Sequence, residues 1–439
     1  MSQHFETLTQ WLLDAVTAPE HFSFAYNAEA SDFVRFNHAK VRQAGQVEQA
    51  SGTLTLIHHG RQADLRLTLS GAASVDCQRL AEGLERLRET LPLLPADPYL
   101  RLNDSAWRNQ RVHTPALPAA EAVVEAVCAA GQGLDLVGIY AAGSISRGFA
   151  SSQGAYGWHH ANSFNLDWSL FHANGQAVKS NYAGDTWQAA QFEQRLAQAR
   201  EQLMYLGRPL KVLPPGSYRA YLAPAALDEI VGMLGWGGFS AQALASKSSP
   251  LQRLYAGEAR FSPLVGFDEQ VSGSLSPAFS EEGYPRRDLA LVRAGQAGER
   301  LVDSRSAAEY GLENNGAGWG ESPGALAMAA GDLARADILR RLGTGLYIGN
   351  LWYLNYSDRS AARMTGLTRF ATFWVEDGQI QAPVSTMRFD DSVYQLLGSQ
   401  LEALTEEREM ILSTSTYDER QTSSSLLPGA LVKQLTLTL

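Results

Sequence analysis

GLYIGNLWYLNYSDRSAARMTGLTRFATFWVEDGQIQAPV, residues 345–384, has a clear strand pattern. Aromatic and β-branched residues, which strands favour, fill 345–354, 368–376 and 379–384. Short segments rich in Ser, Asp, Arg and Gly separate them and are typical of turns. The stretch therefore predicts three consecutive strands and a β-rich C-terminal part of the chain.

The boundary of this β-rich part is expected at VLPPGSY, residues 212–218, where two prolines and a glycine stop a helix and begin a strand. After it we expect further strands at 218–222, 289–294, 300–303 and 434–439. Two helices are expected to interrupt them, at 224–246 and 333–342.

Two further segments precede this boundary, at 1–110 and 111–213, so the third is 214–439. In the first we expect helices at 5–16 and 76–90 and strands at 22–26, 33–37, 49–59 and 63–70, with a hairpin around Gly60-Arg61 and a linker at 91–116. In the second we expect helices at 119–130 and 186–206 and strands at 136–143 and 163–173. The predicted class is α+β, with an N-terminal mixed sheet-and-helix domain before a β-rich C-terminal domain.

The composition and charge of the chain argue against some classes of partner. The net charge of −10 and the pI near 5.5 argue against binding nucleic acid, which needs a basic face. No apolar run approaches the roughly 20 residues that span a bilayer, and residues 1–20 lack a signal-peptide pattern. Cys77 and Cys128 suit reduced thiols packed in a core. We expect a cytoplasmic protein without a membrane or nucleic-acid partner.

LDEIVGMLGWGG, residues 227–238, resembles a catalytic helix from which ligands are missing. Its apolar stripe at i, i+3, i+4 and i+7 is expected to pack on the core; the members are Leu227, Ile230, Val231 and Leu234. Asp228 and Glu229 lie off that stripe and interact favourably with the positive end of the helix dipole. Met233 shares a face with Glu229, but a thioether is a poor zinc ligand, so this helix is not expected to bind zinc.

The distribution of histidines supports the same expectation. All nine precede residue 173, and no cysteine follows Cys128, so a metal site in the C-terminal half would need oxygen ligands, which suit magnesium or calcium. His159-His160 and His58-His59 are expected to have structural or surface roles, because neighbours on a strand point to opposite faces.

The serine-rich and glycine-rich stretches do not match catalytic motifs. GSISRGFASSQG (143–154) and SGSLSPAFS (272–280) lack a G-x-S-x-G turn and are expected to be loops. NNGAGWGESPG (314–324) lacks the Lys-Ser/Thr of a phosphate-binding loop. Its glycines, including Gly316 and Gly318, would let backbone or a peptide approach closely.

Residues 345–393 resemble the C-terminal signature of the TldD/PmbA (TldD/TldE) proteins, with a Gly-Leu-Tyr strand, a Met-Thr-Gly-Leu-Thr-Arg turn, Glu-Asp-Gly-x-Ile, Pro-Val and Arg-Phe. AFSEEGYPRRDLALVRAGQAGERLVDSRSAAEYG (278–311) is similar to another family segment, which leads into a strand and a following helix, and 34–56 is similar in arrangement. The resemblance covers most of the chain and implies a C-terminal domain of the TldD/PmbA type.

The resemblance also implies a function. In this family a TldD-type subunit with a His-Glu-x-x-x-His helix and a cysteine ligand binds zinc, and a TldE/PmbA-type subunit lacks these residues. Together they degrade unfolded peptides in the cytoplasm. In this chain Asp228 and Met233 stand at the two histidine positions, and Glu229 stands at the catalytic glutamate. We carry over no metal ligand, keep Glu229 as a vestigial catalytic candidate, and expect zinc only in a TldD-type partner.

Candidate peptide-binding residues lie in strand 347–354, in the Gly-rich loop and in 365–369. They are Tyr347, Gly316, Gly318, Thr365 and Arg369. Extended peptide would bind by strand addition to a sheet edge. For each, the alternative is an ordinary internal sheet edge or turn.

Three functions stay open. The first is a TldE/PmbA-like subunit that supports cleavage by a TldD-type zinc subunit, as a heterodimer or through a homodimer. The second is a self-sufficient peptidase or hydrolase that uses carboxylates, with Glu229 as general base. The third is a non-catalytic peptide-binding regulatory protein. Family naming also links these proteins to modulation of DNA gyrase, but the acidic charge makes direct DNA contact unexpected.

Overall fold

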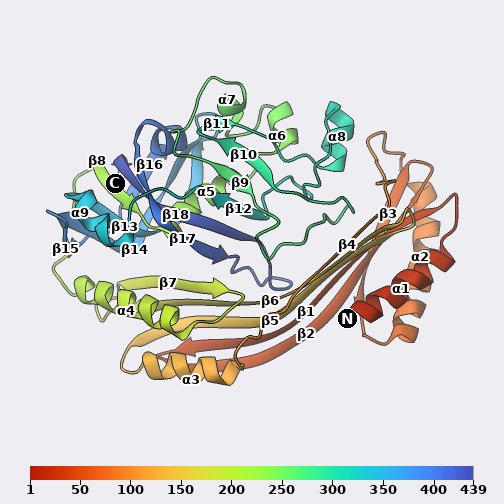
Figure 1. Ribbon diagram of the computed structural model, residues 1–439, viewed down its shortest axis with the longest axis horizontal. Coiled ribbons are helices and arrows are strands. Elements are labelled where there is room, and N and C mark those ends of the chain that lie inside the picture. Colours follow the sequence, from red (N-terminus) through yellow and green to blue (C-terminus); the bar gives the residue numbers. More distant parts are fainter. Residues whose placement is uncertain (439) are drawn as a thin grey trace.

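A computed structural model describes residues 1–438 as two β-sheets with helices packed around them (Figure 1). The N-terminal sheet has the order β3-β2-β1-β5-β6-β4, with β7 also paired to β6. Its strands are β1 (His21–Asn37), β2 (Lys40–His58), β3 (Arg61–Leu69), β4 (Trp107–His113), β5 (Asp135–Ser151), β6 (Ala155–Phe171) and β7 (Ala177–Gly184). Strands from the predicted segments 1–110 and 111–213 thus form one sheet.

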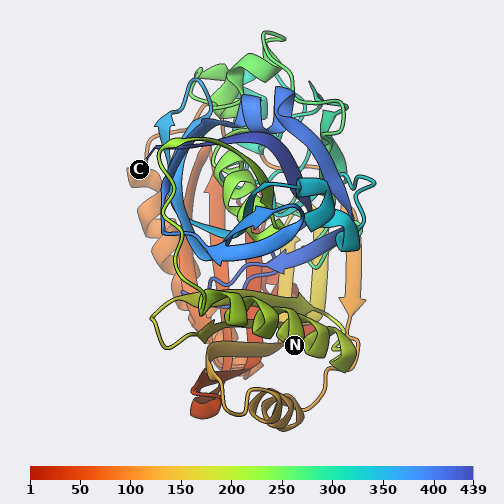
Figure 2. The same cartoon turned by 90° about the vertical axis from the view of Figure 1, so that its left-hand side faces the viewer.

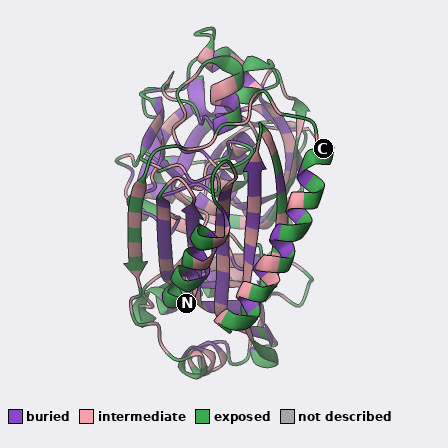
Figure 3. Cartoon of the chain, turned by 90° about the vertical axis from the view of Figure 1, so that its right-hand side faces the viewer, coloured by how far each residue is buried: buried purple, intermediate pink, exposed green. Residues whose placement is uncertain are grey.

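Tight turns connect the first three strands. His38 and Ala39 have positive φ between β1 and β2, and His59 and Gly60 have positive φ between β2 and β3, as two-residue hairpin turns require. The hairpin expected near Gly60 is therefore confirmed. Buried and more exposed residues alternate along much of β1, and Figure 3 shows the strands of this sheet striped in this way.

Three expectations for this sheet were wrong. The region 22–37 is one strand, not two, because its polar middle pairs with β2 on one side and β5 on the other. Most of the expected loop 143–154 belongs to β5 for the same reason, and the expected linker 91–116 contains β4, which pairs with β6. Pairing with neighbouring strands overrides the weak strand propensity of Gly, Ser and Asn.

Two pairs of helices pack at the two ends of this sheet (Figure 1). α1 (Ser2–Ala15) and α2 (Ala73–Thr90) cover one end, where Phe5 packs against Phe24 and Trp158. α3 (Ala120–Ala130) and α4 (Ala189–Leu206) lie at the other end. All four helices were expected from the sequence within a few residues.

The C-terminal sheet closes into a ring around a helix. Its members are β8 (Gly216–Leu222), β13 (Gly345–Asp358), β14 (Arg363–Glu376), β16 (Arg388–Ser392) and β18 (Ser424–Leu437), and β18 pairs back to β8. α5 (Pro224–Gly235) lies inside the ring (Figure 2). The four residues of its predicted apolar stripe are all at most 1% exposed, which explains why this sequence is helical here.

Further elements extend this sheet and its loops. The strands are β9 (Phe267–Glu269), β10 (Leu289–Arg293), β11 (Gln296–Ala297), β12 (Ala325–Met328), β15 (Gln379–Pro383) and β17 (Leu401–Leu412). The short helices are α6 (Ala241–Ala245), α7 (Gln252–Tyr255), α8 (Ser304–Tyr310), α9 (Ile338–Leu342), η1 (Leu91–Leu93), η2 (Arg335–Asp337) and η3 (Gln395–Ser399). No helix in the described part of the chain combines the length and apolarity needed to cross a bilayer.

The α+β class is confirmed, and some details of the C-terminal half differ from expectation. The helix expected at 224–246 ends at Gly235, because Gly237 adopts positive φ, and a new helix begins where the Ser240 side chain accepts a hydrogen bond from the Ala243 amide. The segment 300–303 is not a strand, whereas β17 was not expected.

The segment 413–423, between β17 and β18, fixes the C-terminal half to the N-terminal sheet. Arg420 is 3% exposed and donates from Nη2 to the Ser163 carbonyl at 2.8 Å and from Nη1 to Ser31 Oγ at 3.0 Å. Beside it, Glu419 pairs with Arg147 at 3.1 Å. We call these contacts the Arg420 anchor.

Candidate functional site

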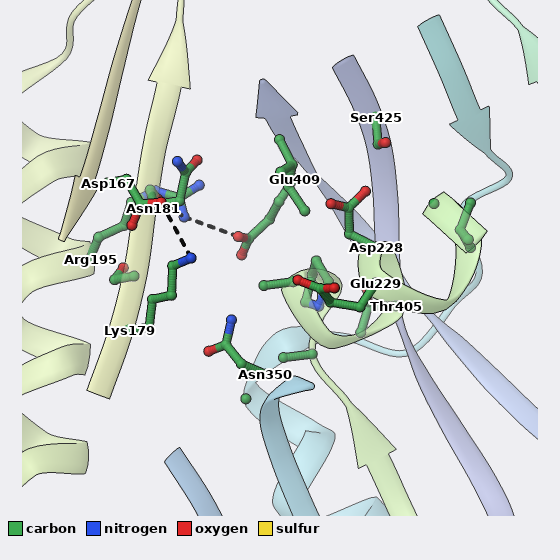
Figure 4. Close-up of a pocket in the computed structure, with 18 of the residues that line it drawn as sticks. Asp167, Lys179, Asn181, Arg195, Asp228, Glu229, Asn350, Thr405, Glu409 and Ser425 are labelled. Atoms are coloured by element: carbon green, nitrogen blue, oxygen red, sulfur yellow. Dashed lines mark hydrogen bonds and ion pairs between the residues drawn. The ribbon is translucent and has the colours of Figure 1, made fainter. Parts of the chain in front are cut away.

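A cleft of about 790 Å³ opens between the N-terminal sheet and the ring. β7 and α4 form one wall, and α5, β13 and β17 contribute the other. Figure 4 shows Asp228, Glu229 and Asn350 on one side and Lys179 and Arg195 on the other. Residues from both halves of the chain therefore face a common space.

Asp228 and Glu229 reach this cleft because α5 buries its opposite face. Asp228 is half-buried and Glu229 is exposed. Desolvation raises the pKa of both carboxyls, and a hydrogen bond from Ser425 partly offsets this for Asp228. For Glu229 the charge of Asp228 adds to the increase, and the charge of Lys179 across the cleft opposes it. Within residues 1–438 neither carboxylate forms an ion pair. The helix thus presents two adjacent carboxylates without a basic partner.

The opposite wall holds its charges in pairs. Lys179 on β7 lies 3.4 Å from Asp167 on β6, and burial raises the pKa of Asp167 while Lys179 opposes that increase. Glu409 on β17 accepts from Arg195 on α4 and from Arg335 on η2, each at 3.0 Å. Glu409 therefore links three elements at the edge of the cleft.

Two tyrosines form part of the floor. Tyr347 and Tyr221 have ring centroids 5.3 Å apart, and Tyr347 Oη accepts a hydrogen bond from Gln202 at 3.4 Å. Burial raises the pKa of Tyr347 to about 12, so its hydroxyl stays neutral at physiological pH. This surface can contact an apolar group and offer a hydroxyl.

The structure brings two of the sequence-derived candidates together. Glu229 and Tyr347 line the same cleft, whereas Gly316, Gly318, Thr365 and Arg369 are not among its lining residues.

Local contacts account for three of these four positions. Gly316 has positive φ, and a side chain there would meet the backbone of Pro285. The Thr365 hydroxyl donates to the Phe389 carbonyl at 2.9 Å, and the Arg369 guanidinium lies 4.2 Å from the ring centre of Trp352. These are structural contacts away from the cleft.

The sequence reasoning missed several cleft residues. Asp167, Lys179, Arg195 and Glu409 come from β6, β7, α4 and β17, and no motif links them along the chain. Asn350 was also missed, because its position in the cleft depends on an irregularity in β13 between Ile348 and Asn350. A local sequence pattern does not contain that information.

The cleft does not fit a catalytic zinc ion, which takes three protein ligands from imidazole, thiolate and carboxylate. Met233 is 5% exposed and packs in the ring's core, so α5 turns only Asp228 and Glu229 of the motif positions toward the cleft. Over residues 1–438, no three His, Cys, Asp or Glu side chains are grouped so that they could hold a metal.

The adjacent histidines of β6 have separate environments. His159 is fully buried, and burial lowers its pKa to about 4. His160 is half-buried, and its Nδ1 lies 2.8 Å from Ser146 Oγ. Both therefore belong to the packing of the N-terminal sheet and not to the cleft.

Comparison with known protein families identifies the C-terminal half of the chain. The family profile described as the PmbA/TldA metallopeptidase C-terminal domain matches residues 215–439. None of the curated proteins matches the sequence.

Solved structures resemble the whole fold at low sequence identity. A TldE from Thermococcus kodakarensis has a TM-score of 0.80 at 15% identity, covering 99% of this chain and 100% of that one. A putative modulator of DNA gyrase from Thermotoga maritima has a TM-score of 0.74 at 14% identity, covering 100% of both. Another from Bacteroides thetaiotaomicron has a TM-score of 0.75 at 15% identity, covering 99% of this chain and 98% of that one.

Proposed function

The chain belongs to the PmbA/TldD family, and from this premise we propose that it is a TldE/PmbA-like subunit of a cytoplasmic system that degrades unfolded peptides. It binds peptide in the cleft, and a TldD-type partner subunit supplies the zinc and the hydrolytic chemistry. This chain contributes positioning, because an oriented substrate and a walled site lower the barrier of a hydrolytic step.

One observation carries the proposal: the helix at the family's catalytic position faces the cleft with carboxylates alone. Asp228 and Glu229 line the cleft, and Met233 lies in the core. A catalytic zinc ion takes three protein ligands from imidazole, thiolate and carboxylate, and this helix offers only two adjacent carboxylates. The cleft is therefore suited to hold a substrate for a reaction completed elsewhere in the assembly.

β7 supports the binding of an extended peptide. Among the described strands it pairs with β6 alone, and its residues 178–181 line the cleft. A strand edge of this kind binds peptide through main-chain hydrogen bonds, which tolerate varied sequences. Tyr347 offers no such edge where it lies, because β13 pairs there with both β8 and β14.

The test is reconstitution with a TldD-type subunit. We expect the chain alone, supplied with zinc, manganese or magnesium, to cleave no unfolded peptide, and the mixture to cleave it. At saturating peptide, Glu229→Gln is expected to leave the turnover number of the mixture within about threefold, since the general base lies in the partner. A mixture no more active than the partner alone would instead favour a non-catalytic peptide-binding regulator.

A second candidate is a self-sufficient hydrolase. Two neighbouring cleft carboxylates whose pKa values are raised could serve as general acid and general base. In that case the chain alone cleaves peptide, and Glu229→Gln lowers its rate about 100-fold or more. The reconstitution experiment therefore separates the two candidates in one series.

A further inference from the structure

The charges that line the cleft are unbalanced. Six acidic and three basic residues line it: Asp167, Glu201, Asp228, Glu229, Glu407 and Glu409, against Lys179, Arg195 and Arg335. All three basic groups are already paired, Lys179 with Asp167 and both arginines with Glu409. The uncompensated charge of the cleft is negative and comes from Glu201, Glu407, Asp228 and Glu229, of which Asp228 and Glu229 are neighbours on α5.

Asn350 is an independent sign of a ligand. It is 8% exposed, it lines the cleft and its side chain points into it (Figure 4), and its carboxamide makes no hydrogen bond to protein within residues 1–438. The carboxamide atoms are not among the fully buried unpartnered ones and open onto the cleft, so a ligand can take the place of water there. A carboxamide both donates and accepts, as does a peptide group.

The backbone irregularity of β13 produces this exposure to the cleft. Ile348 and Leu351 lie in the core, while Tyr347, Gly349 and Asn350 all line the cleft. Two consecutive cleft residues do not fit a regular strand, in which neighbours point to opposite faces. The register shift between Ile348 and Asn350 places both there, and such irregularities often re-aim a side chain next to a functional site.

From these observations we propose that the cleft selects peptides carrying a primary ammonium group, held by Asp228 and Glu229, while Asn350 bonds to a backbone amide of the same peptide. The ammonium is that of a free N-terminus or of a lysine side chain. This inference rests on the proposed function and names the kind of peptide that the chain holds.

The ammonium group of the peptide and the carboxylates of the cleft are chemically complementary. Bringing an ammonium beside the half-buried Asp228 and the adjacent Glu229 gives charge-assisted hydrogen bonds, which are shorter and stronger than neutral ones. It also opposes the desolvation that raises both pKa values. A bare divalent cation is a poorer occupant, because no group of three metal-binding side chains forms within residues 1–438.

Calorimetry with the full chain and three otherwise identical unstructured hexapeptides tests the proposal. The first has a free N-terminus and no lysine, the second is N-acetylated without lysine, and the third is N-acetylated with one lysine. We expect the second peptide, which has no ammonium, to bind at least tenfold more weakly than at least one of the other two. Tighter binding of the first peptide identifies the N-terminus as the source of the ammonium, and tighter binding of the third identifies the lysine. The Asp228→Asn/Glu229→Gln double variant should bind all three within about threefold of one another.

Asn350→Ala tests the amide contact separately. It should weaken every peptide about tenfold and leave the ammonium preference intact, whereas Asn355→Ala, an exposed asparagine of the same strand outside the cleft, should change nothing. Unchanged circular dichroism and melting temperature verify that each variant is folded.

The outcomes distinguish the two claims. Equal binding of the three peptides, or a preference that persists in the double variant, overturns the ammonium assignment and leaves the proposed function standing. Unchanged affinity in Asn350→Ala overturns the amide contact. Binding of no peptide at millimolar concentration overturns the proposed function, and this inference with it.

Discussion

The N-terminal sheet and the ring meet in two regions. Polar groups are paired and buried in one of them and face an open cleft in the other. At the Arg420 anchor, a guanidinium that is 3% exposed bonds to Ser31 and Ser163, and its neighbour Glu419 pairs with Arg147. In the cleft, Glu229 and Asn350 face open space without a protein partner, and Asp228 has a hydrogen bond from Ser425 but no basic partner. The same interface is closed at one region and open at the other.

The difference shows which region stabilises the fold and which is available to a ligand. A buried charge persists only where partners replace its hydration, so the anchor holds the two halves in register. Unpartnered groups in a cleft cost stability and are kept where a ligand completes them. Substitutions of the anchor and of the cleft groups that lack a basic partner should therefore have opposite effects on stability.

Arg420→Ala should have the largest effect. It removes a buried guanidinium, leaves Ser163 and Ser31 without their partner and takes a positive charge away from nearby Glu29, so we expect a loss of about 3 kcal/mol in the free energy of unfolding. Urea denaturation measures this loss. Tyr417→Ala, in the same segment but 97% exposed, is the matched control and should cost almost nothing. A loss below 1 kcal/mol for Arg420→Ala would show that the Arg420 anchor does not stabilise the interface.

Glu409→Gln should have an intermediate effect. The carboxylate ties Arg195 and Arg335 together across the cleft edge, but the three side chains are 22%, 22% and 36% exposed, so solvent screens the pairs. We expect a loss of about 1 kcal/mol. Glu406→Gln, exposed on the same strand, is the control.

The dependence of stability on salt distinguishes the Glu409 ion pairs from the Arg420 anchor. Raising ionic strength from 0.05 to 1 M should shrink the difference between wild type and Glu409→Gln, because screening weakens partly exposed pairs. It should leave the effect of Arg420→Ala nearly unchanged. A Glu409→Gln effect that is insensitive to salt would place the pair among the buried contacts and weaken the contrast between the two regions.

Gly232→Ala should stabilise the fold while harming the cleft. Gly232 lies in α5 on the cleft side, and an added Cβ would have no atom within 4 Å. Helix propensity then favours alanine by about 1 kcal/mol, which a higher melting temperature would show. The methyl group lies one turn from Asp228, so we expect weaker peptide binding. Tighter binding together with higher stability would contradict the placement of the ligand beside α5.

Much of the secondary structure of these regions could be predicted from sequence. The apolar stripe of α5, the β2–β3 hairpin and helices α1 to α4 depend on local periodicity and turn chemistry. The local sequence pattern did not predict strands that depend on their pairing partners. The polar middle of β1 is a strand because β2 and β5 flank it. β17 was missed altogether.

The cleft was less predictable than the fold. Glu229 could be found because it lies beside a regular apolar stripe, and Tyr347 because it lies in a clear strand. Arg195 and Glu409 are 214 positions apart and meet only through tertiary packing. Asn350 reaches the cleft through a backbone irregularity with no sequence signature, so its lack of a partner could be seen only in three dimensions.

Asp228→Asn should have the smallest effect on stability, opposite in sign to that of Arg420→Ala. Burial raises the pKa of Asp228 in the folded state above its unfolded value, so ionisation opposes folding. The cost is absent below the unfolded pKa, near 3.9. It grows as pH rises through the folded pKa and is complete above it.

The asparagine variant removes this cost, so at pH 7 we expect it to be more stable than wild type by about 0.5 kcal/mol. The gain should vanish near pH 3, where Asp228 is protonated in both states. Melting curves of both proteins between pH 3 and 8 measure this window. A variant that is less stable than wild type at pH 7 would mean that the hydrogen bond from Ser425 outweighs the desolvation of Asp228, and the open region of the interface would then resemble the closed one.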